Sequence, residues 1–354
     1  CLTRTRRLNV SSGELRPACC AIFTACWLPE AVWRYDGYMS FLSVLIALLL
    51  EQARPLGPGN SIHHSIRVWV RWCAQNFDAG KSSHGWLAWG FAVGGPSLLV
   101  LLIYWLLQVF VGWPLALLWS VAVLYATLGF RQFSFHFTQI RDALTDGDED
   151  LARQLLADWQ QIDARDLPRS EIVRHVIEHS VLAAHRHVFG VLTWYCVLAA
   201  FGLGPAGAVL YRLSEFVARY WQHKSKTQHQ PMSDALQHIG KTAWAVVDWV
   251  PARITAVSFA VVGSFEDAID GWRNQESRFA YDSDGVVLAA TSGAVNIQLG
   301  GATNPQPTST ETNSVPPRQT PEIAHFPVIV GLVWRTVVMW MVLLALLTLA
   351  RLLG

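Results

Sequence analysis

The sequence predicts an all-α, polytopic membrane protein, and two observations carry this prediction. Of the 354 residues, 52% are hydrophobic and only 15% are charged, which is too little charge for an ordinary soluble protein of this length. Long apolar runs alternate with polar stretches, and 17 residues are tryptophan. We expect about four to five membrane-embedded segments, including a re-entrant or broken helix, and a cytoplasmic helical region. The net charge of +1 gives no basis for nucleic-acid binding.

Residues 1–38 fit poorly with the chain that follows. They begin with a cysteine and contain several arginines and a short apolar patch, whereas a signal peptide has a cleaner apolar core and a small-residue cleavage site. Our interpretation is that they are a non-native upstream extension and that Met39 is the natural start. The apolar segment 39–50 has about half of the roughly 20 residues that a span needs. It packs against the bundle or spans together with upstream residues.

Polar and apolar segments then alternate up to residue 187. Residues 51–85 are polar and carry several arginines, which predicts a cytoplasmic loop because positive charge favours that side. Residues 86–130 are apolar and interrupted at Gly112-Trp113-Pro114, which predicts a hairpin of two near-full spans. Residues 131–187 are polar with helical periodicity, so they predict soluble helices on the cytoplasmic face.

Two histidines in this polar region are spaced like zinc ligands. His175, Glu178 and His179 match the HxxEH pattern of inverted zinc peptidases, in which both histidines hold the metal and the glutamate serves as base. No convincing third ligand follows, and no cysteine pair has metal-ligand spacing. The preferred interpretation is a polar helix face near the membrane surface, without a metal.

The apolar segment 188–210 is interrupted by glycines and a proline between residues 202 and 207. A single crossing would place the basic residues of the next loop, at 212–226, on the outer side, against the positive-inside tendency. A broken, re-entrant hairpin fits better, and irregular backbone at that depth must be buried in protein or line a cavity. We therefore expect a cavity floor beside residues 248 and 253.

The chain ends with a polar region, a linker and one clear span. Residues 263–325 are polar, and their last part, 303–325, is rich in Pro, Thr, Ser and Asn, which predicts a disordered linker. Residues 326–354 are predicted to form the C-terminal transmembrane helix. Arg335 lies close enough to one end of it to reach the membrane surface.

One apolar segment, 243–263, contains an acid, a proline and a base, at Asp248, Pro251 and Arg253. An ionisable residue at membrane depth costs about 2.5 kcal/mol or more unless it is paired and faces a protein interior. We expect Asp248 and Arg253 to pair, with Pro251 disturbing the helix enough for them to meet. The pair is either a structural clamp between helices or part of a binding or catalytic site.

Four segments follow the patterns of one family. Residues 39–51 are similar to its start, residues 204–212 (GPAGAVLYR) to its GxxGAxxYK segment, residues 248–253 (DWVPAR) to its DxxNxxPAR segment, and residues 292–301 (SGAVNIQLGG) to its GALGVRLGG tail. The chain thus resembles the CobD/CbiB superfamily of bacterial inner-membrane proteins from about residue 39 to its end. The resemblance implies a membrane domain over residues 39–302.

The resemblance implies one of two functions. One branch is adenosylcobinamide-phosphate synthase, which joins an aminopropanol unit to adenosylcobyric acid in cobalamin biosynthesis; the other, AmpE, is a membrane protein associated with signalling in β-lactamase induction. The synthase pattern VExxxENxxDG keeps only Glu178 here, and residues 185–187 are His-Arg-His where its amide and acid belong. The NTLDS pattern, near residues 213–217, lacks its Asn and Asp. We therefore favour a diverged AmpE-like membrane sensor or regulatory module, with the active synthase as the alternative.

The resemblance also implies site residues, cofactors and partners. The candidate catalytic residues are Glu178, Asp248 and Arg253, and the candidate cofactor-binding residues are Gly204, Gly207 and Arg212. If the synthase alternative holds, ATP and Mg²⁺ are the implied cofactors. The implied partners are the lipid bilayer of the bacterial inner membrane, a corrinoid or other small-molecule ligand, and a membrane protein partner.

Overall fold

The computed structural model describes residues 40–54, 61–78, 82–160, 162–227, 233–274, 282–300 and 318–353. Within these ranges the regular structure is helical, apart from one isolated β-bridge. The first helix is Ser40–Ala53. The elements after it are α2 (Ser61–Phe77), α3 (Ser82–Trp89), η1 (Gly90–Gly94), α4 (Gly95–Phe110), α5 (Trp113–Thr127), α6 (Phe130–Thr145), α7 (Glu149–Gln160), α8 (Arg169–Ala184), η2 (His185–Phe189), α9 (Gly190–Ala200), α10 (Ala206–Thr227), α11 (Asp234–Val262), α12 (Phe265–Asn274), α13 (Ser283–Val295) and α14 (His325–Leu353).

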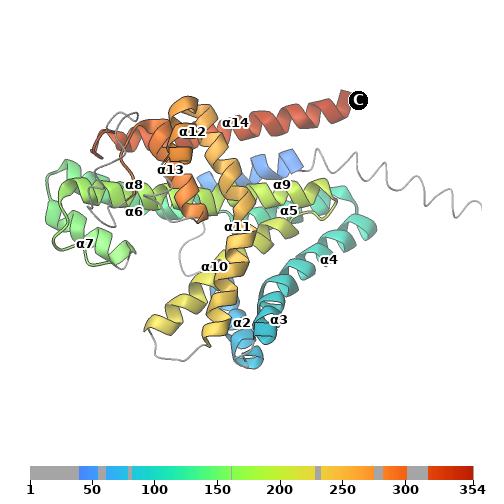
Figure 1. Ribbon diagram of the computed structural model, residues 1–354. Coiled ribbons are helices and arrows are strands. Elements are labelled where there is room, and N and C mark those ends of the chain that lie inside the picture. The colour runs from blue at the N-terminus through green and yellow to red at the C-terminus, as the bar shows by residue number, and fades with distance from the viewer. Residues whose placement is uncertain are drawn as a thin grey trace, which may run out of the picture.

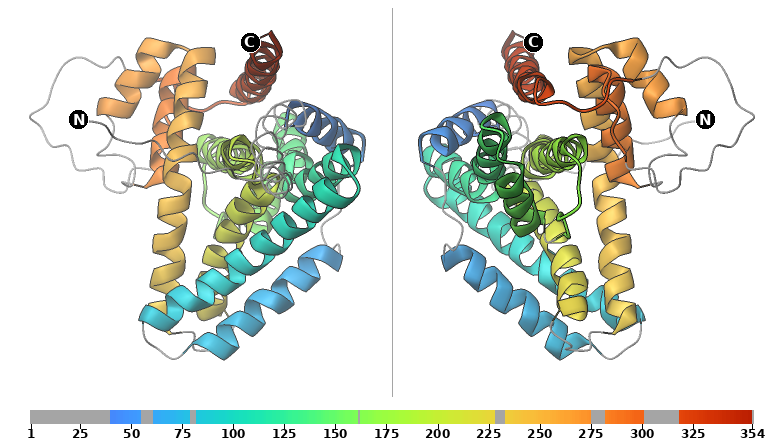
Figure 2. Two further views of the ribbon diagram at one scale, coloured as in Figure 1. Left: turned by 90° about the vertical axis from the view of Figure 1, so that its right-hand side faces the viewer. Right: turned by 90° about the vertical axis from the view of Figure 1, so that its left-hand side faces the viewer.

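One long helix runs through the centre of the fold. α8, the π-helical turn η2 and α9 follow one another without a break. Figure 1 shows this helix lengthwise, and Figure 2 shows it nearly end-on, with α11 crossing it at a steep angle. α11 contacts η2, α9, α10 and α13, so these helices converge on the middle of α11. The fully buried side chains of Phe189, Tyr211 and Phe259 lie in the core.

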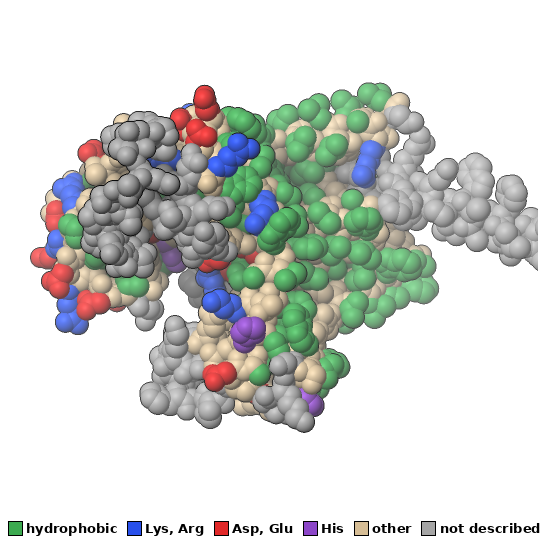
Figure 3. All heavy atoms as spheres, in the orientation of Figure 1, with side chains coloured by type: hydrophobic (Ala, Val, Ile, Leu, Met, Phe, Trp, Pro, Cys, Tyr) green, Lys and Arg blue, Asp and Glu red, His purple; other side chains and the backbone are tan. Residues whose placement is uncertain are grey.

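Within the described part of the chain, the helices long and apolar enough to cross a membrane are Ser83–Phe110, Arg169–Ala200, Asp234–Val262 and His325–Arg351. Two shorter apolar helices accompany them, Ser40–Ala53 and Trp113–Thr127. Hydrophobic side chains gather over α4, α5 and the C-terminal half of α14, whereas charged side chains gather over α6 and α7 at the other end (Figure 3). The predicted all-α, polytopic membrane fold is confirmed. The hairpin break is confirmed as well, between the end of α4 and the start of α5.

Three predicted boundaries are wrong. Residues 51–85, predicted as a loop, contain the amphipathic helix α2, which buries Val70 and Cys73. The basic stretch 212–226, also predicted as a loop, belongs to α10. No boundary separates soluble from apolar helices at residue 187, because α8 buries many of its side chains against neighbouring helices and continues into α9. The polar region after residue 263 contains α12 and α13.

The predicted break between residues 202 and 207 is confirmed as a turn between α9 and α10. Gly202 and Gly204 adopt positive φ angles of 72° and 53°, a conformation that glycine adopts without steric cost. A Cβ atom at Gly207 would lie 2.1 Å from the carbonyl oxygen of Trp194. The two helices therefore pack backbone against backbone just after the turn. Its re-entrant position in the membrane stays a prediction.

Two expectations fall mainly outside the described residues. These are the extension at 1–38 and most of the linker, at 303–317. At the other end of the linker, the Gln298 N–H donates to the Gln319 carbonyl oxygen at 2.8 Å, and the Gln319 N–H donates to the Asn296 carbonyl oxygen at 3.2 Å. The chain is thus fixed beside the end of α13 by Gln319, so the predicted linker does not reach residue 325.

Candidate functional site

α11 carries the carboxylate at the centre of the site. Its N-terminus is capped by Ser233, whose Oγ accepts a hydrogen bond from the Leu236 N–H at 3.2 Å, and serine is a preferred residue at this position. The helix continues through Pro251 to Val262. Residues at helical spacing form its buried face, which includes Val247, Asp248, Pro251, Ala252 and Thr255. The pattern of the helix therefore places Asp248 in the protein interior.

Asp248 links α11 to two other elements. The Tyr211 hydroxyl, on α10, donates to Asp248 Oδ1 at 2.7 Å. His185, on η2, places its Nε2 3.0 Å from the same oxygen and its Nδ1 3.0 Å from Thr255 Oγ1. All four side chains are fully buried. Because a buried charge costs several kcal/mol unless it is paired and hydrogen-bonded, this network is what allows the fold to hold Asp248 there.

η2 places a second polar contact next to the first. Arg186 donates through Nη2 to Asp284 Oδ2. Asp284 lies in the first turn of α13, whose N-cap residue Asp282 accepts the Gly285 N–H at 2.8 Å. A carboxylate in the first turn of a helix is stabilised by the helix dipole. π-helical turns occur frequently at functional sites, and this one directs two consecutive side chains to acids on different helices.

The groups of this site influence one another electrostatically. Burial raises the pKa of the Asp284 carboxyl above its usual value, the Arg186 guanidinium opposes this, and the Asp248 carboxylate adds to it. Burial and the Asp248 carboxylate raise the pKa of Tyr211 well above its usual value, so its hydroxyl stays protonated and donates. We call the residues His185, Arg186, Tyr211, Asp248 and Asp284 the Asp248 site.

Three buried atoms of the Asp248 site have no hydrogen-bond partner among the described residues. They are Asp248 Oδ2, Asp284 Oδ1 and Arg186 Nε. Buried polar atoms are nearly always hydrogen-bonded, and an unpaired one calls for an explanation such as a ligand or a catalytic role. Two carboxylate acceptors beside one guanidinium donor suit a ligand that carries a cationic group next to an anionic one.

The predicted pair between Asp248 and Arg253 is wrong. Five residues along an α-helix correspond to a rotation of about 140° from the starting face, and α11 continues as an α-helix through Pro251. Arg253 Nη1 donates to the Trp249 carbonyl oxygen at 3.0 Å, and its guanidinium lies 3.9 Å from the centre of the Trp249 ring. Arg253 therefore makes a cation–π contact on the outer face of α11.

Glu178 lies apart from Asp248, on α8. It precedes His185 by seven residues, or about 10.5 Å along the helix axis. Its Oε1 accepts hydrogen bonds from Arg174 Nη1 at 2.8 Å and from the Gly300 N–H at 2.7 Å. Glu178 thus attaches the segment after α13 to α8. Tyr211 of the second family-like segment thus contacts Asp248 of the third, and Gly300 of the fourth contacts Glu178, which belongs to the VExxxENxxDG pattern.

The three candidate cofactor-binding residues have packing or ion-pair contacts. A Cβ atom at Gly204 would lie 2.8 Å from the Tyr104 ring, and Gly207 lies against the backbone of α9. Arg212 pairs with the buried Glu215, which also lies 3.4 Å from Arg219 Nε. These contacts give each of the three residues a structural role in the fold. Their role in cofactor binding stays a prediction.

The histidines of the HxxEH pattern contact their own neighbours. The His179 ring lies edge-on to Trp159, with centres 4.4 Å apart, and His175 Nε2 lies 3.4 Å from Arg174 Nη2. In the ranges that the structure describes, no three His, Cys, Asp or Glu side chains are grouped so as to hold a metal ion. The zinc alternative therefore finds no set of ligands there.

Sequence reasoning missed two members of the Asp248 site and undervalued two others. Tyr211 and Asp284 were not proposed, although Tyr211 stands at the tyrosine of the GxxGAxxYK pattern. His185 and Arg186 were noted as departures from the synthase pattern within a region predicted to be polar. The full burial of His185 and the 13% exposure of the Arg186 side chain are tertiary properties that the local pattern does not show.

Together, the fold and the Asp248 site define a multi-pass helical membrane protein with a buried acid–histidine–tyrosine network beside an arginine–acid pair. The family model described as CobD/Cbib protein matches residues 41–333. The chain belongs to the CobD/CbiB family.

Curated relatives agree with this membership. The cobalamin biosynthesis protein CobD of Stutzerimonas stutzeri is 30% identical over 316 residues, covering 86% of this chain and 96% of that protein. The protein of the same name from Chromobacterium violaceum is 32% identical over 187 residues, covering 51% of this chain and 55% of its own. That of Leptospira interrogans is 29% identical over 194 residues, covering 53% and 58%. No solved structure matches the chain.

Arg253→Gln tests the position of Arg253 outside the Asp248 site. Because the change removes one exposed cation–π contact, we expect the free energy of unfolding in detergent to fall by no more than about 1 kcal/mol. Any cellular activity that depends on Asp248 should stay close to that of the unchanged protein. A loss as large as that caused by replacing Asp248 would show that the two residues act together.

Proposed function

We propose that this protein is an enzyme of cobalamin biosynthesis, an adenosylcobinamide-phosphate synthase that joins an aminopropanol unit to a carboxyl group of adenosylcobyric acid. The observation that carries this proposal is the alignment with a cobalamin biosynthesis protein CobD over 96% of that relative's length. It supports the biosynthetic alternative over the AmpE-like sensor that we favoured from the sequence.

The chemistry of the Asp248 site supports the same function. To form an amide, the substrate's ammonium group must lose a proton before its nitrogen attacks the activated carboxyl carbon. In this proposal the unpaired oxygens of Asp248 and Asp284 bind the ammonium group, and Asp248 Oδ2 accepts its proton. Both ring nitrogens of His185 are engaged by Asp248 Oδ1 and Thr255 Oγ1, so His185 holds the carboxylate in position. Arg186 binds an anionic group of the substrate.

The departures from the synthase patterns are compatible with this proposal. With Glu178 at the first acid of the pattern, Ala183 stands at its amide and Arg186 at its aspartate. Arg186 contacts Asp284, and the neighbouring His185 contacts Asp248. The chain therefore replaces this acid by a base and has polar contacts next to the lost amide. Glu178, the acid that the pattern retains, is assigned a positioning role because it holds the Gly300 N–H.

ATP and Mg²⁺ fit this proposal as the source of carboxyl activation. Mg²⁺ is usually held by one or two protein carboxylates together with substrate phosphates. Because the unpaired oxygens of Asp248 and Asp284 are assigned here to the ammonium group, the substrate phosphates would supply most of the ligands of Mg²⁺. Bound Mg²⁺ and ATP would supply the phosphoryl group that activates the carboxyl. The protein's own residues bind the amine, accept its proton and exclude water from the site.

Complementation tests the proposal. The full chain is expressed in a bacterium that lacks its own adenosylcobinamide-phosphate synthase, and cobalamin-dependent growth on cobyric acid is measured. We expect growth. The purified protein in vesicles, given the corrinoid acid, aminopropanol phosphate, ATP and Mg²⁺, should yield the amide, detected by mass spectrometry.

Absence of growth and of amide, with the protein stably inserted in the membrane at normal levels, would contradict the synthase proposal. The regulatory interpretation would then be the next to test, through induction of β-lactamase in a strain that carries or lacks this chain. Growth without amide formation by the purified protein would also contradict it, because the activity would belong to a host component.

A further inference from the structure

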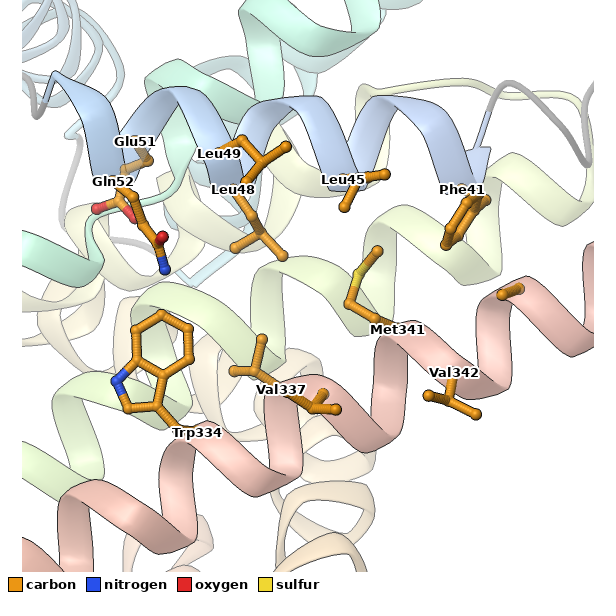
Figure 4. Close-up of a pocket in the computed structure, with 12 residues that line it drawn as sticks. Phe41, Leu45, Leu48, Leu49, Glu51, Gln52, Trp334, Val337, Met341 and Val342 are labelled. Carbon is orange, nitrogen blue, oxygen red and sulfur yellow. The ribbon is translucent and has the colours of Figure 1, made fainter.

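An apolar groove lies between two helices at opposite ends of the chain. One wall is Ser40–Ala53 and the other is α14, and the cavity between them has a volume of about 460 Å³. Figure 4 shows Leu45 and Leu48 on one wall facing Val337 and Met341 on the other. The groove is separate from the Asp248 site, and the proposed function does not use it.

Polarity changes along the groove. Glu51, Gln52 and Trp334 lie at one end, and Phe41 and Val342 lie at the other, with apolar side chains between them (Figure 4). Tryptophan is enriched where a membrane meets water, because its ring is apolar and its N–H is polar. The groove therefore has one end suited to the level of lipid head groups and a body suited to hydrocarbon.

The length of the groove matches one leaflet of a bilayer. Its α14 wall runs from Trp334 to Ala345, which is 11 residues or about 16 Å of helix. Half of a hydrocarbon core about 30 Å thick is about 15 Å. The wall also lies inside the candidate span His325–Arg351. Val338 and Val342, on the same wall, are 57% and 53% exposed, so the groove is open to the surroundings of the helix.

We propose that this groove binds one acyl chain of a bilayer phospholipid, with the head group at the Gln52 and Trp334 end. An occupant with a single polar end and a flexible tail of one-leaflet length satisfies both the polarity and the dimensions. A helix from a second copy does not fit, because about 16 Å of helix with side chains, about 10 Å across, occupies more than ~1,000 Å³. That is over twice the volume of the groove.

Photolabelling in a membrane tests the proposal. The full-length protein is reconstituted in vesicles of phosphatidylethanolamine and phosphatidylglycerol that contain a small fraction of phosphatidylethanolamine with a diazirine on one acyl chain. After illumination, labelled peptides are mapped by mass spectrometry. We expect labelling concentrated at Leu45, Leu48 and Met341, exceeding that at Leu102, which is 56% exposed on α4.

Two variants separate a bound lipid from general contact with the bilayer. Met341→Trp fills the groove and should lower its labelling to the level at Leu102, because the larger side chain occupies the space of the acyl chain. Leu102→Trp, an equally bulky change elsewhere on the apolar surface, should leave groove labelling unchanged. Leu48→Trp fills the groove from the opposite wall. It replaces Met341→Trp in the experiment if thermal unfolding shows that Met341→Trp does not fold.

Several results would overturn the proposal. Equal labelling of the groove and of Leu102 would show that lipid contacts the groove only as bulk solvent. Groove labelling that is unchanged in folded Met341→Trp and Leu48→Trp would also show that no lipid is bound in the groove. Cross-links between two copies of the chain at the groove would identify a second copy as the occupant instead.

Discussion

Asp248→Asn is expected to abolish cobalamin-dependent growth and to lower the rate of amide formation by at least about 100-fold, the lower range for losing general acid–base catalysis. Asparagine keeps the size of the side chain and an oxygen that accepts from the Tyr211 hydroxyl. It removes the carboxylate that accepts the proton and the negative charge that helps to bind an ammonium group. The effect should therefore fall on the chemistry more than on the fold.

The stability of the Asp248→Asn variant distinguishes a loss of catalysis from a loss of folded protein. Replacing a buried carboxylate that two groups contact costs on the order of 1–3 kcal/mol when one hydrogen bond is lost, so the variant should still insert into the membrane. Its amount in the membrane and its thermal unfolding in detergent are compared with those of Arg253→Gln. Full activity of Asp248→Asn at equal protein levels would remove Asp248 from the reaction.

Much of the fold follows from the sequence because its elements are set by local pattern. The hairpin break at Gly112-Trp113-Pro114 combines a glycine, which adopts a positive φ angle of 107°, with a proline in the first turn of α5, where proline is favoured. The apolar run of α14 likewise needs no partner to be identified as a span. The amphipathic α2 was missed because its arginines were taken as signs of a loop, and the spacing of its apolar residues was not weighed.

The site was only partly predictable, because its members meet through tertiary packing. Asp248 can be recognised from the sequence because an acid within an apolar segment needs a partner. The identity of that partner depends on which face of α11 meets η2. A π-helical turn shifts the register of the side chains that follow it, and no pattern in the sequence announces one at His185. The assumption of a local partner, Arg253, therefore failed.

Gly207→Ala is expected to disrupt packing of α9 against α10 and to lower the free energy of unfolding by about 3 kcal/mol or more, at the upper end for adding a methyl group to a packed interior. The added Cβ atom would lie 2.1 Å from the Trp194 carbonyl oxygen and 3.1 Å from the Tyr195 backbone nitrogen. Because backbone atoms cannot rotate away as a side chain does, the helices must separate. Small residues allow such close approach between membrane helices.

This separation should also reach the Asp248 site, because α10 carries Tyr211 only four residues after Gly207. Thermal unfolding in detergent and amide formation are therefore expected to fall together. Gly331→Ala, on α14, is the matched control, since a Cβ atom there meets nothing within 4 Å and alanine favours a helix over glycine by up to about 1 kcal/mol. If Gly207→Ala were as stable as Gly331→Ala, the backbone contact between α9 and α10 would not be a determinant of this fold.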